Sequence, residues 1–300
     1  MWNQRSKLPA YKMRDKLLST IHHNQVTVVS GDTGCGKTTQ VPQLVLDDLI
    51  LNNRGAEANI IVTQPRRISA IGVSERIAAE RCERIGESVG YSIRLDNKRS
   101  RKTRLLLCTT GVLLRRLQCD PDLASVSHVF VDEVHERDLN TDFLLIILKD
   151  LLARRKSLKL VLMSATLNAE RFSNFFGECP TVSIPGRAQP VKEYRLEDAL
   201  EVTGHLILQG SDCAKKNSSK GDGNERLSKT TLKRLYTKYS KNVIDSLAVV
   251  DESITNYELI GALLQYICTD LEEGAILVFL SGMKEITAAM EALTKLEYFQ

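Results

Sequence analysis

Residues 26–51 read VTVVSGDTGCGKTTQVPQLVLDDLIL, and they indicate the architecture of the first half of the chain. The stretch opens on an apolar run rich in β-branched residues, passes through a turn with three glycines, and ends on apolar residues at helical spacing. This order predicts a buried strand, a loop and a helix in direct succession. The turn at 31–38, GDTGCGKT, fits the pattern G-x-x-x-x-G-K-[ST] in the context that gives it meaning, and it predicts a phosphate-binding loop.

Each position of this loop has a physical reason. Glycines let the backbone curl so that its N–H groups face phosphate oxygens, and the start of the helix adds a favourable dipole. The Lys37 side chain is expected to neutralise the β- and γ-phosphates, and the Thr38 hydroxyl is a hard oxygen ligand suited to Mg²⁺. The alternative for Cys35 is that it only fills a position for a small residue. The expected nucleotide-binding residues of the loop are Gly31, Asp32, Thr33, Gly34, Cys35, Gly36, Lys37, Thr38 and Thr39.

The rest of the first half alternates apolar strands with helices. Such alternation predicts an α/β fold with a parallel sheet covered on both faces, and right-handed crossovers bring the carboxyl ends of the strands to one ligand-binding edge. The strands are predicted at 26–30, 60–63, 105–109, 128–133 and 159–166, with helices at 38–51, 68–86, 111–118 and 141–155.

The pattern changes near residues 180–190, PTVSIPGRAQP, which contain three prolines and a glycine and suit a link between domains. We therefore expect one domain over 1–185 and a second over 186–300. The polar stretch at about 209–229 predicts a flexible insertion, with a basic nucleic-acid-binding tail as the alternative. Strands are expected at 191–196 and 275–282, and helices at 197–208 and 283–296.

Composition restricts the class of protein. The chain has 300 residues, 43% of them hydrophobic and 26% charged, which suits a globular protein of two domains. No apolar run approaches the length needed to cross a bilayer, and the start lacks the apolar stretch of a signal peptide, so no membrane partner is expected. A net charge of +4 permits a polyanionic partner without requiring one. The seven cysteines include no C-x-x-C pair. This spacing argues against a zinc site or a disulfide framework and favours a reducing compartment, the cytoplasm or the nucleus.

A second chemical signal is the pair Asp132–Glu133 at the end of HVFVDE. A carboxylate at a strand tip beside the loop can hold Mg²⁺ through water, and a second one can orient and deprotonate an attacking water. We expect Asp132 to serve the metal together with Thr38, and Glu133 to act as the general base. The alternative is a pair of surface acids that opens a helix.

DEVHER at 132–137 closely resembles motif II of the DEAH/DExH-box helicases of superfamily 2. The other motifs follow in the family's order, and their sequences resemble the RNA helicase A-like branch. Within this branch, the chain resembles the members that resolve RNA duplexes and G-quadruplexes, and their close paralogues. The resemblance runs from about Lys7 to Gln300, except for the polar stretch. The matching segments are GDTGCGKTT at 31–39, TQPRRISA at 63–70, TTGVLLRRL at 109–117, SATL at 164–167 and ILVFLSG at 276–282.

The resemblance implies a RecA-like first domain with a P-loop, followed by an incomplete second RecA-like domain. It also implies an ATP-dependent RNA helicase, an ATP hydrolase with Mg²⁺ as cofactor that moves 3′-to-5′ on RNA. The RNA is a single strand, a duplex or a G-quadruplex, and DNA stays open as a substrate. The implied catalytic residues are Glu133, Asp132, Lys37 and His135.

Further roles follow from the resemblance alone. His135 is implied to link the ATP site to Ser164 and Thr166, which connect hydrolysis to domain movement, and Arg76 to pack on the adenine. Taken by itself, His135 could equally be a satisfied buried histidine, and paired arginines are often solvated. The residues implied to hold RNA phosphates are Arg66, Arg67, Arg94 and Thr110.

The chain departs from the family's pattern at Asp32, where relatives usually have glutamate, and at Ser281, where proline is usual. Motifs V and VI do not occur in the chain, and motif VI normally supplies an arginine worth about 10³–10⁵ in rate. We therefore expect the isolated chain to bind ATP weakly and to unwind nothing. A truncated nucleotide- and RNA-binding fragment without turnover is the alternative to the enzyme.

Overall fold

The computed structural model describes residues 5–165, 169–186, 191–215 and 229–296. Contacts between Cα atoms divide the chain into two compact units, residues 1–189 and 190–300. The first unit is a mixed α/β domain, as predicted, and its sheet and loop are those of a RecA-like fold. The assignment of residues 186–300 to a second RecA-like domain stays a prediction.

The described part of the first unit holds one eight-stranded sheet in the order β4-β3-β5-β2-β6-β7-β1-β8. All neighbouring strands are parallel except β3 and β4, which form an antiparallel edge. Because the strands of a parallel sheet point the same way, their carboxyl ends meet at one edge. The strands are β1 (Val26–Gly31), β2 (Ile60–Gln64), β3 (Val89–Ile93), β4 (Asp96–Lys98), β5 (Leu105–Thr109), β6 (His128–Val131), β7 (Lys159–Ser164) and β8 (Thr181–Ile184).

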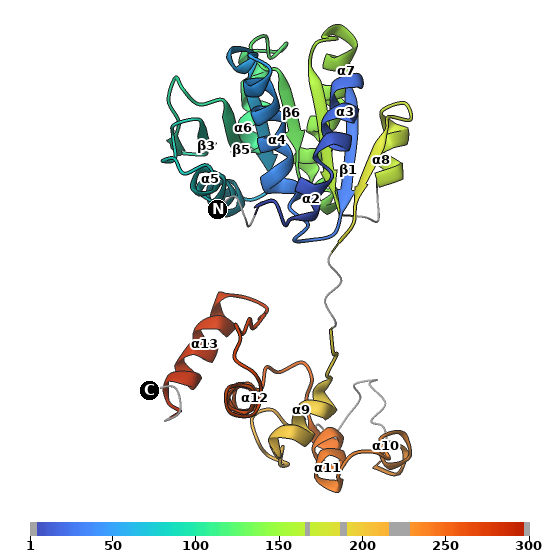
Figure 1. Cartoon of the computed structure of the whole chain (residues 1–300). Coiled ribbons are helices and arrows are strands. Elements are labelled where there is room, and N and C mark those ends of the chain that lie inside the picture. The colour runs from blue at the N-terminus through green and yellow to red at the C-terminus, as the bar shows by residue number, and fades with distance from the viewer. Residues whose placement is uncertain (1–4, 166–168, 187–190, 216–228, 297–300) are drawn as a thin grey trace. The chain divides into compact units, whose positions relative to one another are not determined.

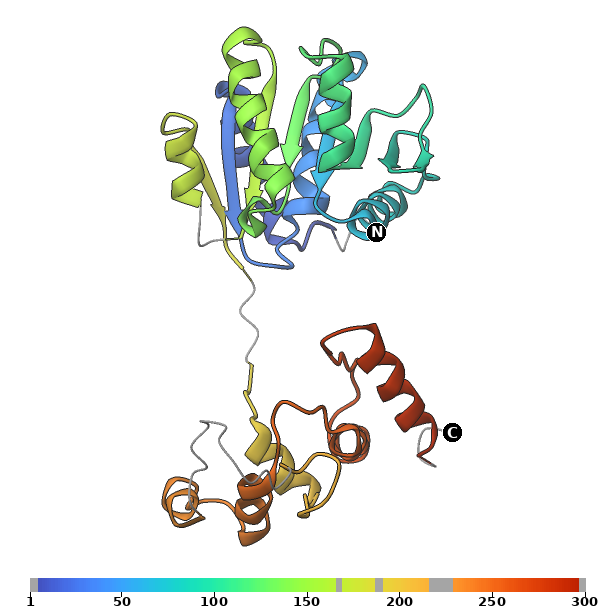
Figure 2. The ribbon, with the colours of Figure 1, turned by 180° about the vertical axis from the view of Figure 1, so that it is seen from behind.

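Helices cover both faces of this sheet, as Figures 1 and 2 show from opposite sides. One face carries α2 (Pro9–Lys12), α3 (Arg14–His23), α4 (Lys37–Leu51) and α5 (Arg67–Glu80). The other carries α6 (Thr110–Cys119), α7 (Leu139–Arg154) and α8 (Ala169–Phe175). Two short 3₁₀ turns, η1 (Gly55–Glu57) and η2 (Val134–Glu136), complete the described elements of this unit.

The two faces explain the unbroken apolar runs of the strands. Val28 and Val29 are both fully buried, yet Val28 belongs to the core beneath α6 to α8 and Val29 to the core beneath α3 to α5. Successive side chains of a strand point to opposite faces, so a sheet covered on both sides needs apolar residues at every position. All five strands predicted in this unit are present, but those predicted at 128–133 and 159–166 end earlier, at Val131 and Ser164.

The predicted link at 180–190 is wrong in its first part, because Thr181–Ile184 forms β8 beside β1. Val182 and Ile184 are buried, while the alternate residues Thr181 and Ser183 are exposed. This alternation is typical of an edge strand with one covered face. The flanking prolines end the strand rather than prevent it.

The described part of the second unit is helical. A small core gathers Leu200, Val243, Val250 and Leu259. The predicted helix at 197–208 ends earlier, at Gly204, whose φ of +64° lies in the left-handed region. The helices are α9 (Leu196–Thr203), α10 (Lys229–Leu235), α11 (Lys241–Val249), α12 (Tyr257–Asp270) and α13 (Met283–Thr294).

The strands predicted at 191–196 and 275–282 are wrong for the described structure of this unit. Neither segment pairs with a neighbour, and Leu277 and Phe279 are 76% and 85% exposed. A parallel strand is stable only when adjacent strands take its N–H and C=O groups. Of the predicted insertion at 209–229, residues 216–228 lie outside the described residues.

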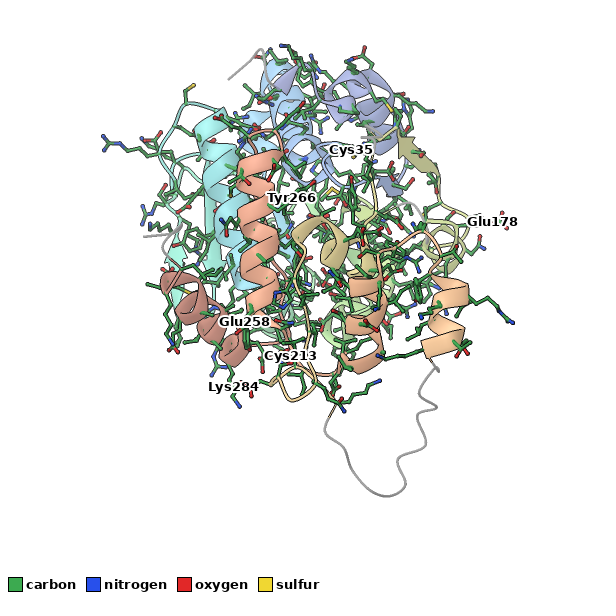
Figure 3. All side chains as sticks on the ribbon, turned by 90° about the horizontal axis from the view of Figure 1, so that it is seen from below. Cys35, Glu178, Cys213, Glu258, Tyr266 and Lys284 are labelled. Carbon is green, nitrogen blue, oxygen red and sulfur yellow. The ribbon has the colours of Figure 1, made fainter. Side chains whose placement is uncertain are left out.

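None of the seven cysteines, all in described segments, forms a disulfide. Cys213 and Glu258 line a cavity of about 570 Å³ near the start of α12 (Figure 3). Burial, followed by the charge of Glu258, raises the pKa of the Cys213 thiol.

Among the helices that the structure describes, none has the length and apolar content required to cross a membrane.

Candidate active site

The predicted phosphate loop leaves the carboxyl end of β1 and enters α4. Gly34 and Gly36 adopt φ values of +80° and +94°, a left-handed conformation that favours glycine. Gly31 is needed for another reason, because a Cβ there would lie 2.8 Å from the Ile184 carbonyl oxygen of β8. The loop therefore has its curled backbone only with glycine at these positions.

Lys37 is the first residue of α4, and its side chain turns back toward the loop. Its Nζ donates to the carbonyl oxygens of Gly31 at 2.5 Å and Asp32 at 3.1 Å, and the residue is only 7% exposed. Cys35 is buried, with its Sγ 3.9 Å from Lys37 Nζ, so its side chain packs beneath the loop. The backbone of α2 also supports the loop, since Ala10 N donates to Cys35 O.

Asp132 follows β6 at the same edge of the sheet. Thr38 Oγ1 and Gln64 Nε2 each donate to its Oδ2 at 2.6 Å, and the Glu133 backbone N–H donates to its Oδ1 at 2.9 Å. The carboxyl group is 2% exposed, and burial raises its pKa to about 6, against the lowering effect of the Thr38 hydrogen bond and with the added charge of Glu133. The structure thus brings Thr38 and Asp132 together, as predicted.

Glu133 and His135 lie beside Ala165, just after β7. Glu133 has a φ of +54°, a rare value for a residue other than glycine, and such strain tends to occur at functional sites. Its Oε2 lies 3.3 Å from His135 Nδ1, and the Ala165 N–H donates to the same Nδ1 at 3.2 Å. A nitrogen that accepts carries no proton, so this bond requires the tautomer protonated on Nε2. His135 therefore contacts the segment after β7, to which the resemblance implied that it links the ATP site.

A cavity of about 370 Å³ opens above the loop. Gly31, Asp32 and Cys35 do not line it, although all three were predicted to bind nucleotide. Gly31 and Cys35 are buried beneath the loop, and Asp32 is exposed outside the cavity. Its lining residues are Leu8, Thr33, Gly34, Gly36, Lys37, Thr38, Thr39, Arg76, Glu80, Glu133 and Ala165.

Glu80 is a site residue that sequence reasoning missed. Its buried carboxylate accepts from Gln40 at 2.8 Å and Gln43 at 2.9 Å, both on the loop's own helix, and from Arg76 Nε at 2.8 Å. Burial acts to raise the Glu80 pKa, but the hydrogen bonds from Arg76, Gln40 and Gln43 together outweigh it, so the pKa lies below its usual value. The only sequence feature that could have pointed to Glu80 was its i,i+4 spacing from Arg76 on a predicted helix. Arg76 is thereby held at the cavity.

The residues expected to contact RNA all lie at this carboxyl edge, but the side chain of one of them is covered. Arg66 pairs with Glu136 at 3.1 Å, and Arg67 donates to the Arg94 carbonyl at 3.3 Å; these three arginines are exposed. Thr110 is 4% exposed, so its side chain is covered. An RNA strand bound at the start of α6 would therefore contact the backbone N–H groups of that helix instead of the Thr110 hydroxyl.

Ser164 ends β7, fully buried, with its hydroxyl donating to the Ala165 carbonyl at 2.9 Å. Thr166, its expected partner in coupling, lies outside the described residues. The expected coupling role of both residues stays a prediction.

The oxygen atoms near Lys37 fit a magnesium ion. The Thr38 hydroxyl and the Asp132 carboxylate are hard ligands 2.6 Å apart, and a cation would offset the cost of an ionised buried carboxylate. Within the described ranges, no group of three or more His, Cys, Asp or Glu side chains is placed to hold a metal. Magnesium suits such a site, because it keeps several waters and takes phosphate oxygens beside one or two protein ligands.

Comparison with known proteins agrees with a nucleotide-binding site at this loop. The family model described as DEAD/DEAH box helicase matches residues 11–175. The chain is 52% identical to the DExH-box ATP-dependent RNA helicase DExH1 of Arabidopsis thaliana, over 96% of the chain and 30% of that protein. It is 50% identical to DExH3 of the same plant, over 96% of the chain and 25% of the relative.

A third relative is the ATP-dependent DNA/RNA helicase DHX36 of Bos taurus, 47% identical over 96% of the chain and 30% of that protein. The chain thus spans less than a third of the length of these relatives. The family match, in contrast, covers more than half of the chain and includes the whole loop and both carboxylates. The chain belongs to the DEAD/DEAH box helicase family.

Proposed function

We propose that this chain is the ATP-hydrolysing part of an RNA helicase that uses Mg²⁺ and couples hydrolysis to movement along RNA. The 3′-to-5′ direction of this movement rests only on the resemblance to the helicase family. The observation that carries the proposal is the cavity above the loop, which Lys37, Thr38 and Glu133 line together. Thr38 in turn donates a hydrogen bond to the buried Asp132. A charged lysine, a magnesium site and a carboxylate base are the three groups that phosphoryl transfer to water requires.

Each residue has a chemical task in this proposal. Lys37 Nζ exchanges its two carbonyl partners for oxygens of the β- and γ-phosphates. Thr38 and Asp132 would hold a magnesium ion, which would supply positive charge against the charge that develops on the phosphates. Glu133 orients a water and takes its proton while the water oxygen bonds to the γ-phosphorus and the bond to the leaving ADP breaks. His135 accepts from the Ala165 N–H and so keeps the segment after β7 beside the ATP site.

The RNA strand is proposed to lie along the carboxyl edge, on Arg66, Arg67 and Arg94. These contacts address phosphates, so binding is expected to ignore base sequence and to weaken with salt. Arg76 stacks on the nucleotide base without reading its edge, which suits loose nucleotide preference.

A steady-state ATPase assay, with and without single-stranded RNA, tests the proposal in a longer protein that includes this chain. RNA-stimulated hydrolysis that disappears in the Lys37→Ala variant is the expected result. Hydrolysis unaffected by that change would contradict the assignment of the site. ATP binding without turnover, even in the longer protein, would favour the alternative of a non-catalytic nucleotide- and RNA-binding module.

One relative, DHX36 of Bos taurus, is a DNA/RNA helicase by name, which favours DNA as a second substrate. The proposed arginine contacts address phosphates, which RNA and DNA share, and do not read a 2′-hydroxyl group. Competition between RNA and DNA strands of one sequence, and between folded G-quadruplex and unfolded forms, decides between these substrates.

A further inference from the structure

The segment at 98–104, which connects β4 to β5, concentrates positive charge at the exposed edge of the sheet. Its sequence is KRSRKTR, with five cationic side chains and no acidic one. Four of these cations are exposed and the last, Arg104, is half-buried. We call residues 98–104 the basic turn. It lies beside β3 in the loop drawn in teal in Figure 1.

The cations of the basic turn have no acidic partners among the residues that the structure describes. The acid nearest in sequence, Asp96, accepts a hydrogen bond from the Tyr91 hydroxyl at 2.8 Å. Elsewhere on this unit, Arg54, Arg81 and Arg137 are each paired with a carboxylate. Like charges held together without partners repel, and a polyanion relieves this repulsion.

The backbone of the basic turn is held firmly. Ser100 N donates to Thr103 Oγ1 at 2.9 Å, and that hydroxyl donates in turn to the Glu87 carbonyl at 2.9 Å. Arg104 N donates to the Ser88 carbonyl at 2.8 Å. Cations on an ordered backbone lose less conformational entropy when they bind a partner than cations on a flexible tail.

The basic turn is separate from the RNA-contacting residues already described. Arg94 follows β3 at the carboxyl edge, next to Arg67. Strand β4 then runs back antiparallel to β3, so residues 99–104 lie at the amino edge, near the start of β3. Three strand residues span about 10 Å. A nucleic acid that touches Arg94 and continues along β4 therefore reaches the basic turn.

We propose that the basic turn binds the sugar–phosphate backbone of a duplex portion of the RNA substrate, while the carboxyl edge holds the single strand; this rests on the proposed function. Residues 94–104 contain no aromatic side chain, so they offer no platform for stacking unpaired bases. A duplex presents closely spaced phosphates on both strands, which a compact group of cations can neutralise without reading sequence.

The test uses the chain with Lys98, Arg99, Arg101 and Lys102 all replaced by glutamine. The matched control replaces four exposed but scattered cations of the same unit, giving the same change of net charge: Lys12, Lys16, Lys156 and Arg171. Fluorescence anisotropy measures binding of a ten-nucleotide single strand and of the same strand joined to a fifteen-base-pair duplex, across a range of salt concentrations. Thermal melting checks the fold, and two double variants, K98Q/R99Q and R101Q/K102Q, repeat the test with smaller changes.

The expected result is an affinity for the tailed duplex about ten-fold lower than that of the control variant, with a salt dependence shallower by about one unit of slope for each lost phosphate contact. Binding of the short single strand should stay equal in both variants. Equal affinity and slope for the tailed duplex would overturn the proposal, as would an equal loss for both RNAs. Failure of the unmodified chain to bind either RNA would contradict the proposed function itself.

Discussion

Thr38 Oγ1 donates a hydrogen bond to Asp132 Oδ2 over 2.6 Å, joining two residues that are 94 positions apart in the chain. The bond connects the first turn of α4 to the end of β6, and Gln64 at the end of β2 donates to the same carboxylate oxygen. The carboxylate is therefore prearranged against the hydroxyl that is proposed to share a magnesium ion with it.

Replacing Lys37 by alanine should lower the affinity for Mg-ATP strongly, because the change removes the cation nearest the phosphates. The fold should survive, since the Lys37 ammonium group bonds only to groups of the loop itself, the carbonyls of Gly31 and Asp32 and the sulfur of Cys35. Titration calorimetry of ATP into both proteins measures the effect, with exposed Lys12 replaced by alanine as the control. Equal affinity in the Lys37 variant and the parent would refute the site.

Replacing Glu133 by glutamine should leave ATP binding nearly unchanged and slow hydrolysis by about 10²–10⁴ in a longer protein that contains this chain. Glutamine keeps the size and hydrogen bonding of the side chain but cannot accept the proton of the attacking water. Binding and single-turnover hydrolysis are measured separately. If hydrolysis stays within a few-fold of the parent, another group is the base, and Asp138 and Asp142 are the next carboxylates to replace.

The pH dependence of stability should report Asp132. Burial raises the folded-state pKa to about 6 from the ordinary value of 3.8, so the neutral carboxyl stabilises the fold at low pH. That stabilisation should be lost as pH rises from about 4 through 6, by about 3 kcal/mol in total. Urea unfolding of the chain at several pH values measures it.

Magnesium and ATP should reverse this trend, because they favour the ionised Asp132, and should stabilise the chain more at pH 7.5 than at pH 5. The Asp132→Asn variant should lose both effects. An unaltered pH profile in that variant would show that a different group is responsible.

Replacing Glu80 by glutamine should weaken ATP binding through the base. The new amide group would face the amide donors of Gln40 and Gln43, and the Arg76 guanidinium would lose its charged partner. We expect several-fold weaker binding of ATP, unchanged binding of inorganic triphosphate, and a loss of about 1–3 kcal/mol in the free energy of unfolding. Exposed Glu75, on the same helix, provides the control variant. Equal weakening for ATP and triphosphate would contradict a role at the base.

Replacing Gly31 by alanine should destabilise the first unit by about 1–3 kcal/mol, because the added Cβ meets the Ile184 carbonyl oxygen of β8 at 2.8 Å. A Cβ added at Gly72 in α5 would meet no atom of a neighbouring element within 4 Å, so Gly72→Ala should be neutral or stabilising by up to about 1 kcal/mol. Chemical unfolding compares the two variants. Similar effects from both would show that β8 does not press on the loop.

The features that depend on neighbouring residues could be predicted from the sequence alone. The strand, loop and helix of residues 26–51, the carboxylates after β6 and the apolar runs of five buried strands all follow from local periodicity and glycine placement. Gly34 and Gly36 have the left-handed conformation that a phosphate loop requires. These features were predictable because backbone sterics and side-chain period act over a few residues.

The features that depend on distant partners arise only in the tertiary structure. The short run Thr181–Ile184 became a strand because β1 offers it a free edge, whereas the more apolar run at 275–282 has no strand beside it in the described residues. The burial of Glu80 behind the loop, and the cover over Thr110, arise from helix packing. Hydrogen bonds between strands and the burial of polar groups both depend on what the fold places alongside, and no local pattern carries that information.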